Sequence, residues 1–530
     1  MKISEIAVTN HSRIPDCRLE IRDNLVFVGP NGSGKSSLLR CLDLLFGKTM
    51  QQLYYNVNKA DFADEEAPLL IEGKLVNLNE DELSFFPDEI DTFDESLTIL
   101  LEASIDGDDI AINRYCPNGP SKSNLTTTQL KSIGWHFVPS DFSAKVLNEG
   151  RKTIVDDFLS GVDTSSSEEE LTEAITSLCG AISNSEAFDM ALSSLASELN
   201  PTLKGGVKSS DLRFIPGAAI DGNLLSDVRL QIKGVSGEMK EATKQSDGTK
   251  ALIAFAVFGL LNPGGILAID EPETHLHPTA QRNLMRILQS KGGQLVIATH
   301  SGVIAGEFNP DNIVVTKENA TPSQPEKDFL KDDLKTLARW WIGSRIELLT
   351  ASRIIAVEGQ SDRMVLEKVA ELTGSYLDRD GIEILEAGGC GEMQHVKKIF
   401  GTEGFGSSVS ILIDQDAEDK MAKALGIPKE KLGSKSVFVS RADLEDEYVS
   451  ALGAAKLWQA IKTSNIFTAN MLRNCSVEDG ASAPSDEKLS SFCRNKNYKI
   501  ASAVVACSLL DSSSSQKVSS IVEALKDVTN

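Results

Sequence analysis

The fold of the first part of this chain is decided by the stretch Gly29-Pro30-Asn31-Gly32-Ser33-Gly34-Lys35-Ser36. An apolar run typical of a buried strand, Leu25–Val28, precedes it, and a segment of helical character follows it. In this context the backbone N–H groups of a glycine-rich loop cradle phosphate oxygens. We therefore predict a nucleotide site to which Lys35 brings charge for the β- and γ-phosphates and Ser36 a ligand for Mg²⁺. The expected nucleotide contacts are Gly29, Asn31, Gly32, Ser33, Gly34, Lys35 and Ser36.

A second apolar strand, Ile266–Ile269, ends in two acids, Asp270 and Glu271. Downstream of a phosphate loop, an acid at a strand end holds Mg²⁺ through water, and the next acid orients the attacking water. We predict that Asp270 contacts the metal and the nucleotide, and that Glu271 is the general base of ATP hydrolysis.

Further along the chain, carboxylates again follow apolar strands. Glu358 and Asp362 come after Ile354–Val357, and Asp414 and Asp416 come after Val409–Ile413. Strand ends converge in α/β folds, so we expect the four acids to meet at one edge of a sheet. Clustered carboxylates repel one another unless a cation lies among them, and Mg²⁺ or Mn²⁺ prefers oxygen ligands. The alternative is a set of solvated acids at loop starts, which is common in a chain with 77 acidic residues.

The composition fits a globular protein of several domains. The chain has 530 residues, 41% of them hydrophobic, and its eight scattered cysteines form no CxxC pair. We find no apolar run long enough to span a membrane and no signal peptide, and we expect a cytoplasmic location without membrane contact. The net charge of −24 argues against a bulk electrostatic coating of nucleic acid, although a local basic groove remains compatible with it.

Composition shifts suggest the domain boundaries. A polar segment with two prolines, 318–325, reads as a linker. We predict an α/β protein with an ATPase domain over 1–325, a linker helix and second α/β domain over 326–450, and a mainly helical region over 451–530. Within the first domain, 66–115 reads as β-rich and about 150–212 as a helical insertion, which is either an ordinary surface lobe or a dimerisation arm.

The order of motifs in the first half resembles the ABC-type ATPases. Gln245–Lys250 is similar to their S-x-G signature, Asp270–Pro278 to the E-P-E-x-x-L-H-P of the SMC, RecF and OLD relatives, and His300 to the switch histidine. In that family the signature of one subunit contacts ATP on another. The resemblance implies that Ser246 and Gly248 complete a nucleotide site across a homodimer or higher homo-oligomer. For the pair His275 and His277 we favour a structural role over zinc binding, because further ligands at metal spacing are lacking.

The second half resembles the Toprim domain, which has an acidic E then D-x-D metal centre. An ABC-type ATPase followed by Toprim resembles the OLD (overcoming lysogenisation defect) nucleases, including the nuclease of the Gabija system and retron-associated anti-phage members. By that resemblance Glu358, Asp362, Asp414 and Asp416 bind metal, and Glu358, Asp414 and Asp416 are catalytic. Glu445 or Asp446 is implied for a second metal, unless this is simply a solvated helix start. Lys499 is a candidate for the family's basic residue, although a solvated basic helix is the reading we favour.

The leading hypothesis is an ATP-regulated, Mg²⁺- or Mn²⁺-dependent endonuclease of double-stranded DNA. It would act in anti-phage defence, with an accessory defence protein or a retron component as a further partner. The alternative is an ATP-gated sensor or scaffold whose Toprim-like domain binds a partner or nucleic acid without cutting. Strand passage and primase chemistry are disfavoured, because neither a tyrosine-bearing cleavage domain nor a zinc motif is visible. Five cations near the linker are candidates for DNA contact, and Trp340 and Trp341 beside them are expected to be packing anchors. These cations are Lys331, Lys335, Arg339, Arg345 and Arg353.

Overall fold

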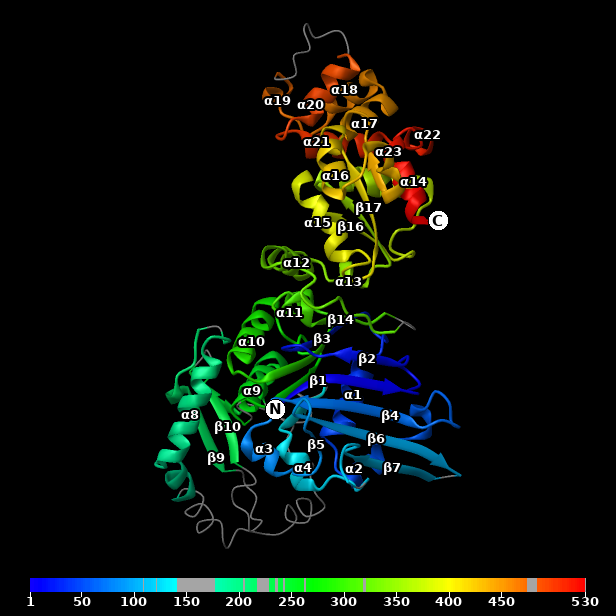
Figure 1. Ribbon diagram of the computed structural model, residues 1–530. Coiled ribbons are helices and arrows are strands. Elements are labelled where there is room, and N and C mark those ends of the chain that lie inside the picture. Colours follow the sequence, from blue (N-terminus) through cyan, green and yellow to red (C-terminus); the bar gives the residue numbers. More distant parts are fainter. Residues whose placement is uncertain are drawn as a thin grey trace. The chain divides into compact units, whose positions relative to one another are not determined.

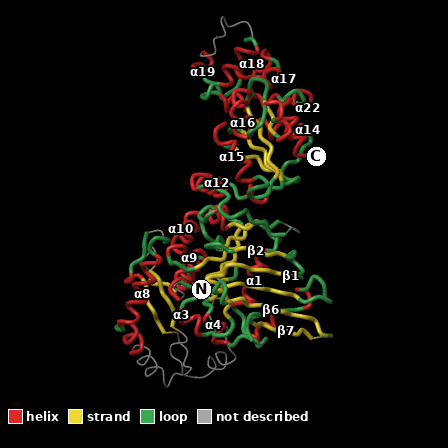
Figure 2. The backbone as a smooth tube through the Cα atoms, in the orientation of Figure 1, coloured by secondary structure: helices red, strands yellow, loops and turns green. Residues whose placement is uncertain are grey.

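The chain separates into two compact units, Met1–Pro322 (unit 1) and Ser323–Asn530 (unit 2). The structure, a computed structural model shown in Figures 1 and 2, describes most of both units. The described residues are 1–107, 109–120, 122–140, 177–203, 205–216, 228–233, 237–241, 244–261, 264–317, 321–473 and 484–529. Within them, no helix is both long and apolar enough to cross a membrane.

Unit 1 is built on two large sheets. One is antiparallel, and its strands are β2 (Cys17–Glu20), β1 (Lys2–Thr9), β4 (Leu69–Val76), β6 (Ser96–Asp106), β5 (Ile90–Asp91) and β7 (Asp109–Tyr115). The other is parallel, in the order β14 (Ile313–Val315), β3 (Leu25–Val28), β13 (Gln294–Thr299), β12 (Ile266–Asp270) and β8 (Trp135–Val138). The β-rich prediction for 66–115 and the strands predicted before the phosphate loop and at Ile266–Ile269 are therefore confirmed.

Helix α1 (Lys35–Phe46) forms the centre of unit 1, because it packs against both sheets. Nine of its twelve residues are buried, and their apolar side chains share one core with residues of the antiparallel and parallel sheets. Phe46 at its end packs against Trp135 of β8, with ring centroids 5.7 Å apart. The helix that starts at the glycine-rich loop is thus held in place from two sides.

A smaller lobe follows in the chain. Helix α8 (Glu186–Leu199) packs against β9 (Leu212–Pro216), the edge of a three-stranded antiparallel sheet with β10 (Val228–Lys233) and β11 (Met239–Glu241). The helical insertion predicted over about 150–212 is helical over 177–183 and 186–199, and its first part, up to residue 176, lies outside the described residues. The sequence analysis did not anticipate the small sheet.

Unit 2 contains a four-stranded parallel sheet in the order β16 (Ile382–Glu386), β15 (Arg353–Val357), β17 (Ser408–Ile413) and β18 (Val437–Val439). Each strand leads into a helix or helical turn, so the sheet has the crossover connections of an α/β fold. The helices that follow these strands are α14 (Gln360–Thr373), α15 (Cys390–Phe400), α16 (Glu418–Leu425) and α17 (Leu444–Leu452). Ahead of the sheet lie α12 (Asp332–Ser344) and α13 (Glu347–Thr350), where one continuous helix was expected.

The C-terminal helices complete the core of the same unit. They are α18 (Ala454–Thr463), α19 (Ala469–Arg473), α20 (Asp486–Arg494), α21 (Lys499–Leu509), α22 (Ser512–Ser515) and α23 (Ser519–Thr529). Helix α21 packs along α14, and α23 packs on β17 and β18 (Figure 1). Leu457, Ala506 and Ile521 from this region lie in one hydrophobic cluster with Ile355 and Leu412 of the sheet. The helical prediction for this region is confirmed.

The contact between α1 and the antiparallel sheet gives a stability prediction. A Cβ atom on Gly73 of β4 would lie 2.4 Å from Phe46 Cζ and 2.8 Å from Leu45 Cδ2. We expect Gly73→Ala to lower the unfolding free energy of unit 1 by about 1–3 kcal/mol, because α1 is held on its other side and cannot retreat. Thermal unfolding of the full chain measures the effect.

Gly180→Ala is the matched control, because Gly180 is helical and a Cβ there meets no atom within 4 Å. Alanine is more favourable than glycine inside a helix, so this control should melt at or slightly above the wild-type temperature. A Gly73→Ala protein as stable as its parent would contradict the packing of α1 on β4.

Candidate functional sites

The phosphate loop joins β3 to α1, as the sequence predicts. Gly34, directly before the helix, has φ of 92°, a left-handed conformation that glycine adopts without a Cβ penalty. Gly29 is needed for a different reason, since a Cβ there would lie 2.2 Å from the Thr316 carbonyl oxygen at the end of β14. The N-terminus of α1 and the backbone of the loop form a concave site of the kind that binds phosphate.

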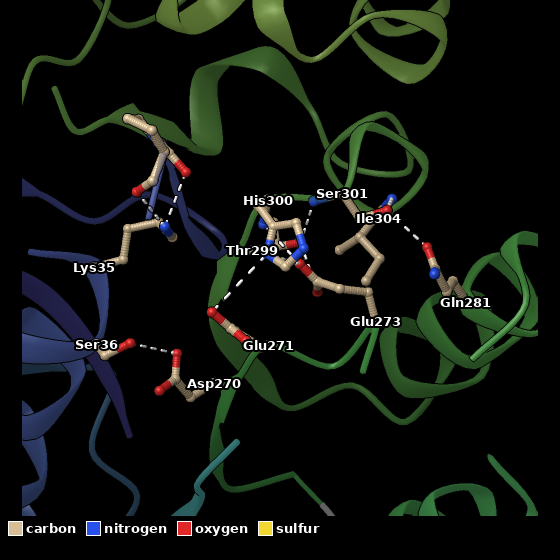
Figure 3. Close-up of polar contacts among 12 residues, drawn as sticks. Lys35, Ser36, Asp270, Glu271, Glu273, Gln281, Thr299, His300, Ser301 and Ile304 are labelled. Atoms are coloured by element: carbon tan, nitrogen blue, oxygen red, sulfur yellow. Dashed lines mark hydrogen bonds and ion pairs between the residues drawn. The ribbon is translucent and has the colours of Figure 1, made fainter. Parts of the chain in front are cut away.

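Ser36 connects this loop to the strand end that carries Asp270, whereas Lys35 bonds back to the loop itself (Figure 3). The Lys35 ammonium donates to the carbonyl oxygens of Gly29 and Pro30 at 2.9 Å each, and burial lowers its pKa. The Ser36 hydroxyl donates to Asp270 Oδ1 at 3.0 Å. Burial raises the pKa of Asp270 to about 6, although the hydrogen bond from Ser36 and the charge of Lys35 oppose this shift. The structure thus brings together the residues predicted to bind Mg²⁺ and nucleotide.

Glu271 and His300 lie on neighbouring strand ends. Glu271 has φ of 49°, and its N–H donates to the Ala298 carbonyl at 2.9 Å. Its carboxylate is 3.9 Å from His300 Nδ1 (Figure 3). A non-glycine residue in the left-handed region is uncommon and is often found at functional sites. The structure thus brings together Glu271, predicted as the general base, and His300, which resembles the switch histidine.

Glu273 is a residue whose role the sequence analysis missed. It is buried, and its Oε1 accepts a hydrogen bond from the His300 N–H at 2.7 Å and lies 3.0 Å from His300 Nδ1. Its Oε2 accepts from the Thr299 hydroxyl at 2.8 Å. Glu273 therefore ties the loop after β12 to the end of β13 and orients His300. The second glutamate of the Glu-Pro-Glu stretch, Glu271–Glu273, is the signal that points to it.

The signature residues Ser246 and Gly248 lie at the start of α9 (Asp247–Leu261). Ser246 is exposed, and its hydroxyl contacts Thr249 Oγ1 at 3.0 Å. Gly248 lies against the backbone of His275, where a Cβ would be 2.7 Å from the carbonyl oxygen. Within the described part of the chain, no hydrogen bond or ion pair is found between Ser246 and the phosphate loop. The contacts found for the two signature residues are with Thr249 of α9 and with the backbone of His275.

His275 and His277 serve the turn before α10 (Pro278–Ser290). His275 has φ of 64°, and His277 Nδ1 accepts from the Thr279 N–H at 3.4 Å as the N-cap of the helix. This is the structural role that we favoured over zinc binding.

In unit 2 the predicted carboxylates gather at the carboxyl edge of the parallel sheet. Glu358 follows β15 and Asp414 follows β17, whereas Asp362 lies in the first turn of α14. Together with Asp416 and Asp443 they line a cavity of about 770 Å³. The Gly359 N–H donates to Asp362 Oδ2 at 2.9 Å, which turns this carboxylate back toward the strand end. Convergence of the four acids, expected from strand order alone, is what the structure shows.

Lys499, at the start of α21, lies among these acids. Its ammonium is 3.6 Å from both Asp362 Oδ1 and Glu445 Oε1, and its side chain is only 23% exposed. Burial alone would lower its pKa, but the surrounding carboxylates, Asp362 and Glu445 first, raise it. The reading of Lys499 as part of a solvated basic helix is therefore wrong, because α21 packs along α14 and turns this side chain inward.

The structure also separates Glu445 from Asp446. Glu445 is 1% exposed, so the solvated alternative is wrong for it, and neither of its carboxylate oxygens has a hydrogen-bond partner. Burial raises its pKa to about 8. Asp446 instead faces Arg494, which lies 2.7 Å from its Oδ2 and also contacts Asp443. Of the two candidates, Glu445 is the one near Asp362 and Asp414.

The acid cluster fits a hard divalent cation in its chemistry. Its donors are carboxylate oxygens, and the buried oxygens of Glu445 lack the hydrogen bonds that burial normally requires. Burial also raises the pKa of Asp414 to about 7; Lys499 opposes this shift, and Asp362 and Glu358 reinforce it. Within the described residues, no three His, Cys, Asp or Glu side chains are already arranged as a metal site. Binding a cation would therefore require side chains to turn toward it.

The cations proposed for DNA contact are largely engaged within unit 2. Lys335 pairs with Asp328 at 3.2 Å, Arg345 donates to the Ile384 carbonyl, and Arg353 donates to the Asp527 carbonyl at 3.1 Å. Trp341 is buried against Phe400, as a packing anchor should be, whereas Trp340 is 62% exposed. The basic side chains that line the acid cavity are instead Arg494, Lys496 and Lys499.

Comparison with known families divides the chain in the same way. Residues 1–133 match the family described as AAA ATPase domain, and residues 224–305 match AAA domain, putative AbiEii toxin, Type IV TA system. Residues 349–416 match the TOPRIM domain of overcoming lysogenization defect protein-like proteins. The fold and its two sites thus define an ATPase joined to a Toprim domain.

Individual relatives agree with this division. The OLD nuclease of Thermus scotoductus is 22% identical over 429 residues, which are 73% of this chain and 77% of that protein. The energy-coupling factor transporter ATP-binding protein EcfA2 of Staphylococcus aureus is 31% identical over 104 residues, 19% of this chain and 36% of that protein. The chain is an ATPase–Toprim protein consistent with the OLD family. Its similarity to an OLD nuclease supports a nuclease-like ATPase.

Among solved structures, similarity is found to Smc head domains. The head from Pyrococcus furiosus, bound to the C-terminal domain of ScpA, has a TM-score of 0.41 and 15% identity and covers 61% of this chain and 95% of that chain. The head from Thermotoga maritima has a TM-score of 0.35 and 14% identity and covers 62% of this chain and 100% of that chain.

The buried contacts of Glu273 give a testable prediction. Glu273→Ala leaves the Thr299 hydroxyl and the His300 N–H without their acceptor, and His300 loses its fixed position. We expect the rate of ATP hydrolysis to fall about 10- to 100-fold, because the hydrogen bonds that orient His300 are lost. ATP binding should stay near normal. Phosphate release and nucleotide affinity, measured on the same preparation, separate the two effects.

Glu307→Ala provides the control, because Glu307 makes ion pairs with Arg286 outside the site. Its hydrolysis rate should match that of the parent. Wild-type turnover by Glu273→Ala would show that His300 does not depend on this carboxylate.

Proposed function

We propose that this protein is an ATP-regulated, divalent-metal-dependent DNA endonuclease. The observation that carries the proposal is the group of carboxylates around Lys499 at the carboxyl edge of the Toprim sheet. Glu445 is buried, and neither of its carboxylate oxygens has a hydrogen-bond partner, which costs the fold stability. Its place beside Asp362, Asp414 and Lys499 therefore favours a cation-dependent function over a purely structural one. The homology to an OLD nuclease supports the same activity.

In the proposed reaction Mg²⁺ or Mn²⁺ would be held by Glu358, Asp362, Asp414, Asp416 and Glu445. When bound, such ions activate water and stabilise the leaving oxygen of a phosphodiester. Lys499 carries positive charge into the same cavity and balances the acids around the phosphate. Arg494 and Lys496 line the cavity as well. Their positive charges would contact backbone phosphates of the DNA and fix its register. The net charge of −24 makes this local patch, and not bulk charge, the source of DNA affinity.

ATP would bind through the phosphate loop, with Lys35 leaving the carbonyls of Gly29 and Pro30 for the β- and γ-phosphates. Ser36 and Asp270 are already paired where Mg²⁺ belongs, and Glu271 with His300 would orient the attacking water. Ser246, which is exposed at the start of α9, supports a homodimer, because the signature then presents a solvent-facing residue to the nucleotide of a second subunit.

The cellular role is proposed from the same resemblance. OLD-type ATPase–Toprim proteins such as the Gabija nuclease suggest cytoplasmic anti-phage defence on double-stranded DNA, with an accessory defence protein or retron component as partner. Plaque counts on cells carrying the wild type or a variant with an altered acid cluster test this role. Protection that persists without cleavage would instead favour the ATP-gated sensor or scaffold.

The acid cluster gives the central prediction. Asp414→Ala should abolish cleavage of plasmid DNA in Mg²⁺ or Mn²⁺, because it removes one of the carboxylates proposed to hold the metal. Glu358, Asp362 and Asp416 line the same cavity. ATP hydrolysis should persist, since Asp414 belongs to unit 2. DNA binding should survive or strengthen, because a negative charge near the phosphates is lost. Plasmid nicking, phosphate release and a gel shift measure the three properties.

Asp419→Ala is the matched control, because Asp419 lies nearby on α16 with an 81% exposed side chain that pairs with Lys429. This variant should cut like the wild type. Full cleavage by Asp414→Ala would place the nuclease centre elsewhere or point to a contaminant, and an inactive wild type would exclude the proposed activity under these conditions.

The dimer gives a separate prediction. Ser246→Arg should impair hydrolysis but spare ATP binding, whereas Lys35→Ala should prevent binding. Mixing the two variants should partly restore hydrolysis, because a mixed dimer has one site with both an intact phosphate loop and an intact signature. Ser290→Arg, at an exposed helix end, controls for the bulky cation. Absence of recovery in subunits shown to exchange would contradict the shared site.

A further inference from the structure

Two loops at the carboxyl edge of the Toprim sheet are joined by reciprocal hydrogen bonds. Gln415, between the acids Asp414 and Asp416, donates its backbone N–H to the Ala442 carbonyl at 3.1 Å. In return, the Ala442 N–H donates to Gln415 Oε1 at 3.1 Å. One glutamine therefore satisfies both backbone polar groups of Ala442, which belongs to the loop after β18.

The backbone at Ala442 is unusual. Its φ of 64° lies in the left-handed region, which is unfavourable for a residue with a Cβ atom. Such a conformation persists only where neighbouring contacts enforce it. The two hydrogen bonds from Gln415 are contacts of this kind. They act directly before Asp443, which lines the acid cavity, and close to the buried Glu445.

The far side of the same loop is anchored to the C-terminal helix. Glu447 Oε1 accepts from the Arg441 N–H at 3.0 Å, and its Oε2 accepts from the N–H and hydroxyl of Ser520 at 3.1 and 2.9 Å. Ser520 is the second residue of α23, which packs on β17 and β18. The loop is thus held between α23 on one side and Gln415 on the other.

A third bond connects the two loops through an acid. The Leu444 N–H donates to Asp414 Oδ1 at 3.1 Å, so one oxygen of Asp414 already has a partner in the other loop. A shift of the β18 loop would therefore displace Asp414 together with Asp443 and Glu445.

We propose that Gln415 is a positioning residue that locks the loop bearing Asp443 and Glu445 to the loop bearing Asp414 and Asp416. The inference rests on the proposed function, because it assigns Gln415 the task of holding Glu445 beside Asp414 and Asp416 in one cation site. A glutamine can do this, since its side-chain amide oxygen is the acceptor for the Ala442 N–H.

Two substitutions at Gln415 separate the effect of the hydrogen-bond acceptor from the effect of side-chain size. Gln415→Met keeps the length but removes the acceptor, and Gln415→Glu keeps an oxygen for the Ala442 N–H. Gln459→Met, on the exposed side of α18, is the matched control for the chemical change. Thermal unfolding of each full-length variant checks that the fold is retained, and Gln415→Ala is the second variant that should behave like Gln415→Met.

Four measurements on the full-length protein follow. Calorimetric titration with Mn²⁺ should show affinity reduced about 10- to 100-fold in Gln415→Met, the usual effect of losing a group that orients metal ligands. Plasmid cleavage should lose kcat with little change in KM for DNA, and ATP hydrolysis should be unaffected. Hydrogen exchange at the peptide containing Ala442, measured without metal or DNA, should be faster. Gln415→Glu should restore most of each property.

The outcomes distinguish this inference from the proposed function. Wild-type exchange at Ala442 and wild-type Mn²⁺ affinity in Gln415→Met would overturn the positioning role, and so would Gln415→Glu behaving as badly as Gln415→Met. A wild-type protein that cuts no DNA would refute the nuclease proposal. The exchange rate at Ala442 would still decide whether Gln415 holds the loop.

Discussion

A parallel sheet delivers the carboxyl ends of all its strands to one edge, and both candidate sites of this protein depend on that constraint. In unit 1 the ends of β3, β12 and β13 bring the phosphate loop, Asp270 and His300 into one site. In unit 2 the ends of β15, β17 and β18 bring Glu358, Asp414 and Asp443 to one cavity. Backbone hydrogen bonds inside each sheet fix the strands, so the acids are held close together despite their mutual repulsion.

Both sites then face the problem of buried charge. Lys35 donates to backbone carbonyls and, among the residues that the structure describes, forms no ion pair with an acid, whereas Lys499 lies directly among carboxylates. Neither arrangement neutralises its surroundings, since burial raises the pKa of Asp270 and of Glu445 well above the usual range. Imbalance of this kind costs stability and is characteristic of sites that complete their charge with a ligand.

Supporting groups explain how such sites remain rigid. Glu273 ties Thr299 and His300 to the loop after β12, and Glu447 ties the β18 loop to α23. The C-terminal helices are thus part of the acid site and not an appendage to it. Their apolar faces lie in the same hydrophobic core as the sheet, so the position of Lys499 and the position of Ser520 are set together.

The sequence alone determined the strand–loop–helix at Gly29–Ser36, the acids at strand ends and the helical character of the last region. These features are local, because apolar runs, glycine turns and adjacent acids lie within a few residues of each other. Tertiary structure decided that Lys499 lies among acids, that Glu445 and not Asp446 faces them, that Glu273 holds His300, and that Gln415 reaches Ala442. Each of these depends on which way a helix or loop turns when it packs against elements far away in the chain, and no short stretch of sequence contains that information.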